Sequence, residues 1–235
     1  MRYLALCCDY DGTLAEDGKV SSATVNALER LRASGRKIFL VTGRVLAELQ
    51  TVCNRLDLFD RVVAENGASL YNPSTREERV LAERPPDLFI QTLRQRGVQP
   101  LSVGQVIVGA CRRQETIVLN AIRDLGLELQ IVFNKDAVMV LPTGVNKASG
   151  LTVALQELNL SPHAIVGIGD GENDDVFLAA CEIGVAVENA VVPLKAKADF
   201  VTLNACGAGV VELIEELLAD DLRTRESRLT GRRDH

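Results

Sequence analysis

The sequence predicts an α/β protein built on a parallel sheet that helices cover on both faces. Three largely apolar runs of strand length, at residues 4–8, 37–41 and 164–168, are each followed by small polar or acidic residues and then by a helix-like pattern. Strands that are apolar at every position suit the centre of such a sheet, because neither face meets water. The length of 235 residues allows one domain with a sizeable insertion, or two small domains.

The first of these runs ends in two carboxylates, Asp9 and Asp11, followed by Gly12 and Thr13. In open α/β sheets, ligands bind at the carboxyl ends of the strands. Two carboxylates at ~4 Å repel by about 4 kcal/mol at an effective dielectric constant near 20, so the pair favours a shared proton or a hard divalent cation such as Mg²⁺. A solvated turn without function is the alternative interpretation of these residues.

Composition excludes several classes of function. The net charge of -6 and the aromatic content of 4% make nucleic acid a poor partner. No apolar run approaches a membrane span and no signal-type segment begins the chain, so we expect a cytoplasmic protein that does not bind a membrane. The six cysteines lack Cys-x-x-Cys spacing and fit reduced core residues. With only His163 and His235 present, catalysis is expected to use carboxylates, lysine and metal.

The second strand ends in Thr42, Gly43 and Arg44, ahead of a helix expected over residues 45–56. A hydroxyl and backbone N–H groups at such a turn can bind an anion. The alternative is a glycine turn in which the threonine only caps the helix. Residues 61–71 then predict two strands joined by an Asn-Gly turn.

A change of pattern follows, with its own alternation of helices and strands. We expect a compact α+β unit over residues 73–143, inserted into a core of residues 1–72 and 144–218. Its predicted elements are helices over 87–96 and 115–125 and strands over 103–110, 128–133 and 137–141. Residues 219–235 read as a charged tail or a linker to a further domain or partner.

Two further polar groups stand at element ends in the second half of the chain. Lys147 precedes a helix, where a cation is electrostatically misplaced unless an anion lies nearby. Asp170, Asn173 and Asp174 follow the strand at 164–168, and helix capping accounts for only one or two of these polar side chains. Because right-handed crossovers bring parallel strand ends to one sheet edge, these residues could converge with Asp9.

The ordered set of these motifs resembles the four motifs of haloacid-dehalogenase-like (HAD) phosphatases: Asp9-Tyr-Asp11-Gly-Thr13, Thr42-Gly-Arg44, Asn146-Lys147 and Gly169-Asp170-x-x-Asn173-Asp174. The segment Glu65-Asn66-Gly67-Ala68 and the site of the insertion resemble the branch with a type IIB cap, which includes sugar-phosphate, sucrose-phosphate and phosphoglycolate phosphatases. The resemblance implies a Rossmannoid core with an inserted cap.

The resemblance also implies roles for individual residues. Asp9 would be the nucleophile that becomes an aspartyl phosphate, and Asp11 the general acid and base. Thr42, Gly43 and Lys147 would hold the phosphoryl group. Mg²⁺ would be bound by Asp9, Asp170 and the backbone carbonyl of Asp11. Asn173 and Asp174 would support these ligands, and Arg44 and Asn189 would flank the site.

These expectations describe a magnesium-dependent phosphatase for a small phosphorylated metabolite, either a sugar phosphate or a phosphorylated acid. A phosphomutase of the same fold, a non-catalytic phosphate-binding regulatory module and a receiver-type phosphoacceptor are the alternatives. Arg112, Arg113 and Lys135 are candidate cap contacts to the substrate. The sequence gives no oligomeric state.

Overall fold

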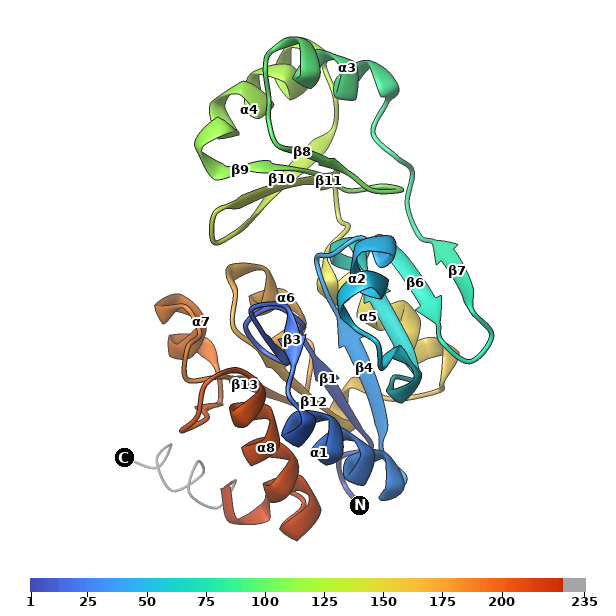
Figure 1. Ribbon diagram of the computed structural model, residues 1–235, viewed down its shortest axis with the longest axis vertical. Helices are drawn as coiled ribbons and strands as arrows, with labels where there is room; N and C mark the ends of the chain where they lie inside the picture. Colours follow the sequence, from blue (N-terminus) through green and yellow to red (C-terminus); the bar gives the residue numbers. More distant parts are fainter. Residues whose placement is uncertain (226–235) are drawn as a thin grey trace.

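An eight-stranded sheet forms the centre of the larger unit of the computed structural model, which describes residues 1–225 (Figure 1). Its strand order is β14-β13-β12-β1-β4-β5-β6-β7, parallel from β14 to β5 and antiparallel from β5 to β7. The strands are β1 (Ala5–Cys8), β4 (Lys37–Val41), β5 (Arg61–Ala64), β6 (Ser69–Asn72), β7 (Glu77–Val80), β12 (Ile165–Gly169), β13 (Ile183–Ala186) and β14 (Phe200–Val201). The predicted α/β fold class is confirmed.

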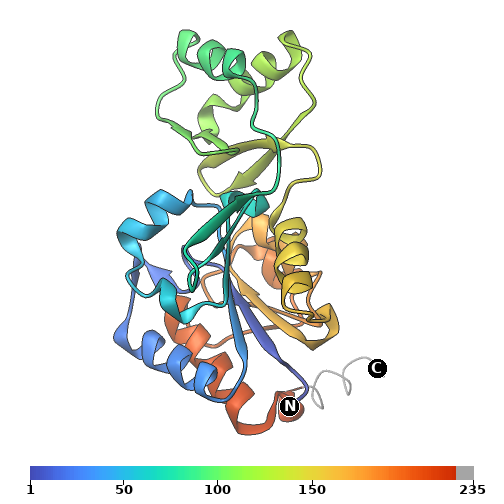
Figure 2. The ribbon, with the colours of Figure 1, turned by 90° about the vertical axis from the view of Figure 1, so that its right-hand side faces the viewer.

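Helices cover both faces of this sheet (Figure 2). Helices α1 and α8 pack against each other on one face, and α5 and α6 contact each other on the opposite face. The helices of this unit are α1 (Ser22–Ala33), α2 (Leu46–Val52), α5 (Lys147–Glu157), α6 (Asp175–Leu178), α7 (Val192–Lys197) and α8 (Cys206–Asp220). A two-stranded hairpin of β2 (Ala15–Glu16) and β3 (Lys19–Val20) follows the first strand.

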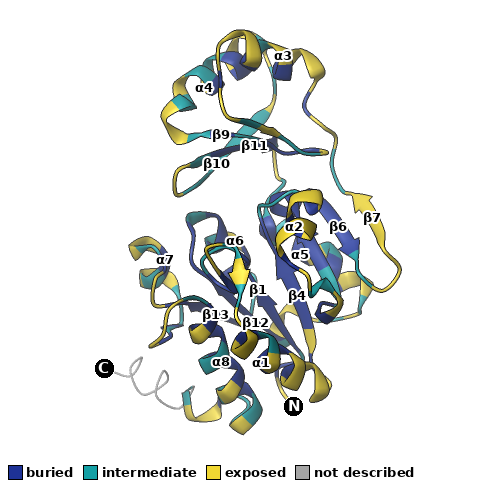
Figure 3. Ribbon diagram, viewed as in Figure 1, coloured by how far each residue is buried: buried dark blue, intermediate teal, exposed yellow. Residues whose placement is uncertain are grey.

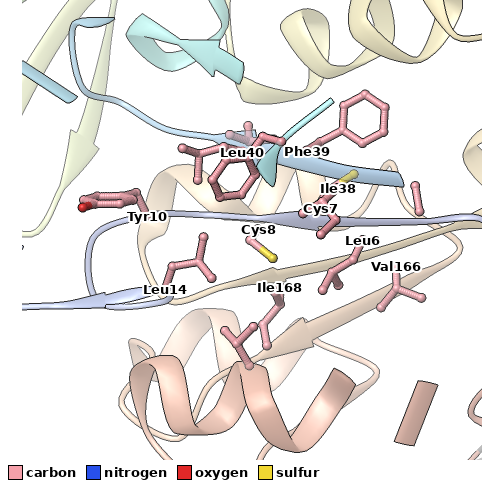
Figure 4. Close-up of a cluster of buried hydrophobic side chains, with 14 of the residues drawn as sticks. Leu6, Cys7, Cys8, Tyr10, Leu14, Ile38, Phe39, Leu40, Val166 and Ile168 are labelled. Atoms are coloured by element: carbon pink, nitrogen blue, oxygen red, sulfur yellow. The ribbon is translucent and has the colours of Figure 1, made fainter. Parts of the chain in front are cut away.

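The central strands β1, β4 and β12 are buried at every residue except Lys37, the first residue of β4, as their apolar sequences predict (Figure 3). Leu6 and Cys8 of β1 share one face of the sheet with Leu40 of β4 and Ile168 of β12, and these side chains belong to one buried cluster (Figure 4). The register pairs Cys8 with both Leu40 and Ile168, so β1, β4 and β12 end at the same edge of the sheet.

The second unit stands above that edge and consists of a four-stranded antiparallel sheet covered by two helices (Figure 1). Its strand order is β10-β11-β9-β8, and α3 and α4 pack together on its outer face. The elements are α3 (Asp87–Gln95), β8 (Leu101–Val103), β9 (Val108–Cys111), α4 (Glu115–Asp124), β10 (Leu129–Asn134) and β11 (Ala137–Pro142). We refer to this unit as the cap and to the larger one as the core.

Three details differ from the sequence-based expectations. The single strand expected over 103–110 is wrong, because a turn at residues 104–107 divides it into β8 and β9. The helix expected over 45–56 is shorter and ends at Val52. Strand β7 pairs with β6 in the core sheet, so the core extends beyond residue 72, as far as Val80.

We propose that the chain divides into a core and an inserted cap, with the first boundary moved past Val80. Helix α8 continues to Asp220, so the expected tail at 219–235 begins within a helix. Residues 226–235 of that tail lie outside the described residues. No helix in residues 1–225 has the length and apolar character required to cross a bilayer.

Candidate active site

A cleft of about 240 Å³ lies between the carboxyl edge of the core sheet and the cap. Asp9, Asp11 and Thr42 line it from the core, and Ile107 and Met139 line it from the cap. The residues expected at the ends of separate strands therefore meet at one place, because the parallel register aligns those ends.

Lys147 reaches this edge from the first turn of α5. Its side chain is only 1% exposed, and its Nζ donates a hydrogen bond of 2.6 Å to Asp9 Oδ1 and a second one to Asp174 Oδ1. Helix α5 comes close enough because two glycines meet: a Cβ on Gly150 would lie 2.6 Å from the Cα of Gly67. The anion inferred from the misplaced lysine is thus a pair of carboxylates of the protein itself.

Three buried carboxylates form a candidate metal site. Asp9, Asp170 and Asp174 can each offer an oxygen such that the three atoms lie within 4.8 Å of one another. Asn173 Oδ1 is a buried oxygen without a hydrogen-bond partner in the structure, and it belongs to the same loop as Asp170 and Asp174. Oxygen donors of this kind are the ligands preferred by hard divalent cations, so the residues present fit such an ion.

The electrostatics of this cluster also favour a cation. Burial, with the neighbouring Asp174, raises the pKa of Asp9 well above its ordinary range, against the attraction of Lys147. Burial likewise raises the pKa of Asp170. Although burial disfavours a charged lysine, Asp174 and Asp9 together hold the pKa of Lys147 above its ordinary value. The carboxylates therefore lack sufficient positive charge, which a divalent cation would supply.

A lysine of the cap supplies part of this missing positive charge. Lys135, at the β10–β11 turn, places its Nζ 2.5 Å from Asp170 Oδ2, and Asp170 Oδ1 accepts a hydrogen bond of 3.1 Å from Thr13. The same turn donates the backbone N–H of Lys135 to Glu172 at 3.0 Å. The tip of the cap thus contacts the acidic loop of the core directly.

The second carboxylate of the first motif lies apart from this cluster. Asp11 accepts two hydrogen bonds from Arg44, at 2.6 and 2.7 Å, and its side chain is 40% exposed at the cleft. Thr42 is buried, and its hydroxyl accepts the backbone N–H of Arg44 at 3.1 Å. Gly43 lines the cleft beneath the cap: a Cβ there would lie 3.2 Å from Met139 Sδ.

Two of the remaining candidates, Asn173 and Asn189, connect loops around the site. Asn173 donates to Asn66 at 3.0 Å and joins the acidic loop to the turn after β5. Asn189 bridges two backbone groups, donating to the carbonyl of Gly12 and accepting from the N–H of Cys206, and it does not line the cleft.

The cap candidates differ in their partners. Lys135 contacts Asp170 of the acidic cluster, whereas Arg112 lies 3.6 Å from the carboxylate of Glu172, and neither residue lines the cleft. Arg113 does not line it either.

Sequence reasoning missed one residue that ties the two units together. Glu65 is fully buried and accepts the backbone N–H groups of Gln105, Val106 and Ile107 in the cap. The sequence placed Glu65 in a turn and in a segment that resembles the type IIB branch, but it gave no role to the side chain.

The profile of haloacid dehalogenase-like hydrolases matches residues 6–109 and 113–214. The chain belongs to this family. Among curated relatives, a phosphoglycolate phosphatase of Methanothermobacter thermautotrophicus is 29% identical over 224 residues, covering 91% of this chain and 98% of the relative. Phosphoglycolate phosphatase 2 of Saccharolobus solfataricus is 30% identical over 223 residues, covering 92% and 93%.

Solved structures show the same HAD fold. A haloacid dehalogenase-like hydrolase from Bacteroides thetaiotaomicron has a TM-score of 0.78 at 20% identity, with 92% of this chain and 99% of that chain covered. A HAD subclass IIB sugar phosphatase has a TM-score of 0.73 at 23% identity, with 91% and 98% covered. The resemblance noted in the sequence and the enzyme class that it implied, a HAD-type phosphatase, are confirmed.

Proposed function

We propose that the protein is a magnesium-dependent phosphatase that hydrolyses a small phosphorylated carboxylic acid or sugar phosphate through an aspartyl-phosphate intermediate. The observation that carries this proposal is the contact of Asp9 with Lys147 and with the acidic cluster, at a cleft that Asp9, Asp11 and Thr42 line. This set supplies a nucleophile, a proton donor and acceptor, and charges for a phosphoryl group.

The proposed chemistry has two steps. An Asp9 carboxylate oxygen attacks phosphorus, and the bond to the leaving oxygen breaks as Asp11 donates a proton to it. Asp11 then takes a proton from water, whose oxygen attacks the same phosphorus and releases phosphate from Asp9. Lys147 and the Thr42 hydroxyl, with the Gly43 backbone, hold the phosphoryl oxygens throughout.

Asp9, Asp170 and the backbone carbonyl of Asp11 would hold the Mg²⁺, with Asp174 and Asn173 beside them. When bound, the ion would offset the negative charge of the phosphoryl group and of the carboxylates. Asp174 already has a fixed place, because its Oδ2 accepts the backbone N–H groups of Asp170 and Gly171 at 2.9 and 2.8 Å.

A phosphorylated acid is the substrate class that we favour. Arg44 lies at the cleft and binds the Asp11 carboxylate with both hydrogen bonds of a bidentate pair. A substrate carboxylate would match the same guanidinium fork and free Asp11 for proton transfer. The small cleft and the phosphoglycolate phosphatases among the relatives support the same choice.

Phosphate release from a panel of phosphomonoesters tests this proposal. With Mg²⁺ we expect release from 2-phosphoglycolate at a kcat/KM at least about tenfold above that for glucose 6-phosphate, because the pairing of Arg44 with a carboxylate contributes about 1.5–3 kcal/mol. With a chelator in place of Mg²⁺ we expect release to fall to background. Transfer of phosphate between sugar positions would favour a mutase, and no turnover of any phosphoester would favour the regulatory module.

Removal of the Lys135 ammonium should strengthen metal binding. Lys135 pairs with Asp170, a proposed ligand, and is 47% exposed, so we expect Lys135→Met to lower the Kd for Mg²⁺ by only about threefold to fivefold. Calorimetric titration of Mg²⁺ into the substrate-free protein measures this. Lys197→Met is the matched control, because Lys197 pairs with Asp175 outside the acidic cluster. An unchanged or weaker affinity of Lys135→Met for Mg²⁺ would contradict the inference that the Lys135 ammonium competes with the ion for Asp170.

We also infer a reducing, cytoplasmic setting. All six cysteines lie in the described part of the chain and are free thiols, which suits a compartment that keeps thiols reduced.

A further inference from the structure

We infer that Glu65 is a positioning residue that fixes the substrate-facing turn of the cap, residues 104–107, relative to the phosphate-binding loop, residues 42–44. The inference goes beyond the proposed phosphatase chemistry, and its kinetic part rests on that function. Glu65 belongs to the core, while the turn joins β8 to β9 in the cap.

The contact between Glu65 and the cap turn is buried and is made by several hydrogen bonds. Glu65 is 0% exposed, and its two oxygens accept three consecutive backbone N–H groups, from Gln105 and Val106 at 2.8 Å and from Ile107 at 2.9 Å. Hydrogen bonds to an ionised acceptor are about twice as strong as neutral ones. Gly104 allows the approach, because a Cβ there would lie 2.6 Å from Glu65 Oε2.

The other end of Glu65 is tied to the phosphate-binding loop. Its backbone N–H donates to the Arg44 carbonyl, and the next N–H, of Asn66, donates to the Thr42 carbonyl, both at 2.9 Å. Glu65 itself has φ of 49°, a left-handed conformation that is unfavourable for a residue with a side chain. These hydrogen bonds thus hold Glu65, in a strained backbone conformation, between the phosphate-binding loop and the cap.

The turn that Glu65 holds forms part of the substrate cleft. Ile107 lines the cleft opposite Asp9 and Thr42, and the buried side chains of Val106 and Ile107 pack with Met139 between core and cap. Other polar contacts between core and cap in the described residues lie at more open positions, such as Ser102 with Glu48 at 3.3 Å and Lys135 with Asp170. A shift of the turn would therefore move the wall that faces the leaving group.

Two variants test the contact, one with a substitution in the core and one with a substitution in the cap. Glu65→Gln keeps the side-chain size but directs an NH₂ group at backbone donors, and Gly104→Ala pushes the turn away from Glu65 without changing any residue of the core. Asp60→Asn is the matched control: Asp60 also accepts a backbone N–H, from Ile38 at 2.9 Å, but at the opposite edge of the core sheet. Thermal unfolding establishes that each variant is folded, and Gly104→Ala decides the test if Glu65→Gln does not fold.

Amide hydrogen exchange gives the first readout, and it needs no activity. We expect exchange at residues 105–107 to accelerate about tenfold or more in Glu65→Gln and in Gly104→Ala, and to stay unchanged in Asp60→Asn. Wild-type exchange rates at 105–107 in both variants would overturn the inference. Because this readout is independent of turnover, it stands even if the phosphatase proposal fails on the substrate panel.

The second readout is kinetic. We expect both variants to raise KM for the preferred substrate about tenfold and to reduce discrimination between leaving groups by a similar factor, since small displacements of positioning groups are costly. The inhibition constant of inorganic phosphate should stay within about twofold, because the residues proposed to hold phosphate, Thr42, Gly43 and Lys147, all belong to the core. Equal losses in phosphate inhibition and substrate KM would indicate general damage and overturn the positioning role.

Discussion

Asp9→Asn is expected to reduce phosphate release by at least about 10⁴-fold, because the amide cannot attack phosphorus to form the covalent intermediate. Asparagine has nearly the same shape as aspartate, so the cleft should keep its form. Acid-quenched reactions with labelled substrate should show label on the wild-type protein and none on the variant.

The same substitution should leave the fold intact. Asp9 is one of three clustered carboxylates, and Lys147 keeps its second partner, Asp174, when Asp9 is neutral. We therefore expect the melting temperature of the metal-free variant to equal or exceed that of the wild type. Activity above about 1% of the wild type in Asp9→Asn would contradict the nucleophile assignment.

Lys147→Met is expected to lower kcat by about 10²- to 10³-fold, the usual cost of removing one donor aimed at transition-state charge. It should also destabilise the metal-free protein by about 3–5 kcal/mol, because the carboxylates of Asp9 and Asp174 lose their buried ammonium. Denaturant unfolding with a chelator present measures the second effect. Lys197→Met, at an exposed ion pair, is the control and should cost under about 1 kcal/mol.

The pH dependence of this variant has a definite sign. The folded-state pKa of Asp9 is already raised above its ordinary value of 3.8, and loss of Lys147 removes an interaction that lowers it. Between the unfolded and the raised folded pKa, the folded state binds more protons, so stability falls as pH rises through that window. We expect Lys147→Met to be more stable near pH 5 than near pH 8, and saturating Mg²⁺ to restore part of the loss. A destabilisation independent of pH and metal would contradict a charge-balancing role.

Local patterns in the sequence were sufficient to predict the core strands and their carboxyl ends. The runs that became β1, β4 and β12 are apolar apart from Lys37 at the start of β4, and Asp9, Thr42 and Asp170 follow them directly. Periodicity and turn chemistry are local properties, so a single chain displays them. The cap was predicted less well, because a turn that begins at Gly104 interrupts the strand expected over 103–110. All but one of these residues are apolar or glycine, so the sequence carries no clear break signal there.

The sequence by itself determined which chemical groups stand at the strand ends and, through the order of its motifs, the family to which the chain belongs. Only the tertiary structure decided their partners: Asp11 with Arg44, Asp170 with Lys135, and Glu65 with the backbone of the cap. These pairs join residues separated by 33 to 42 positions. Such contacts depend on how two units of the fold approach each other, and three backbone N–H groups have no side-chain identity that a sequence could reveal.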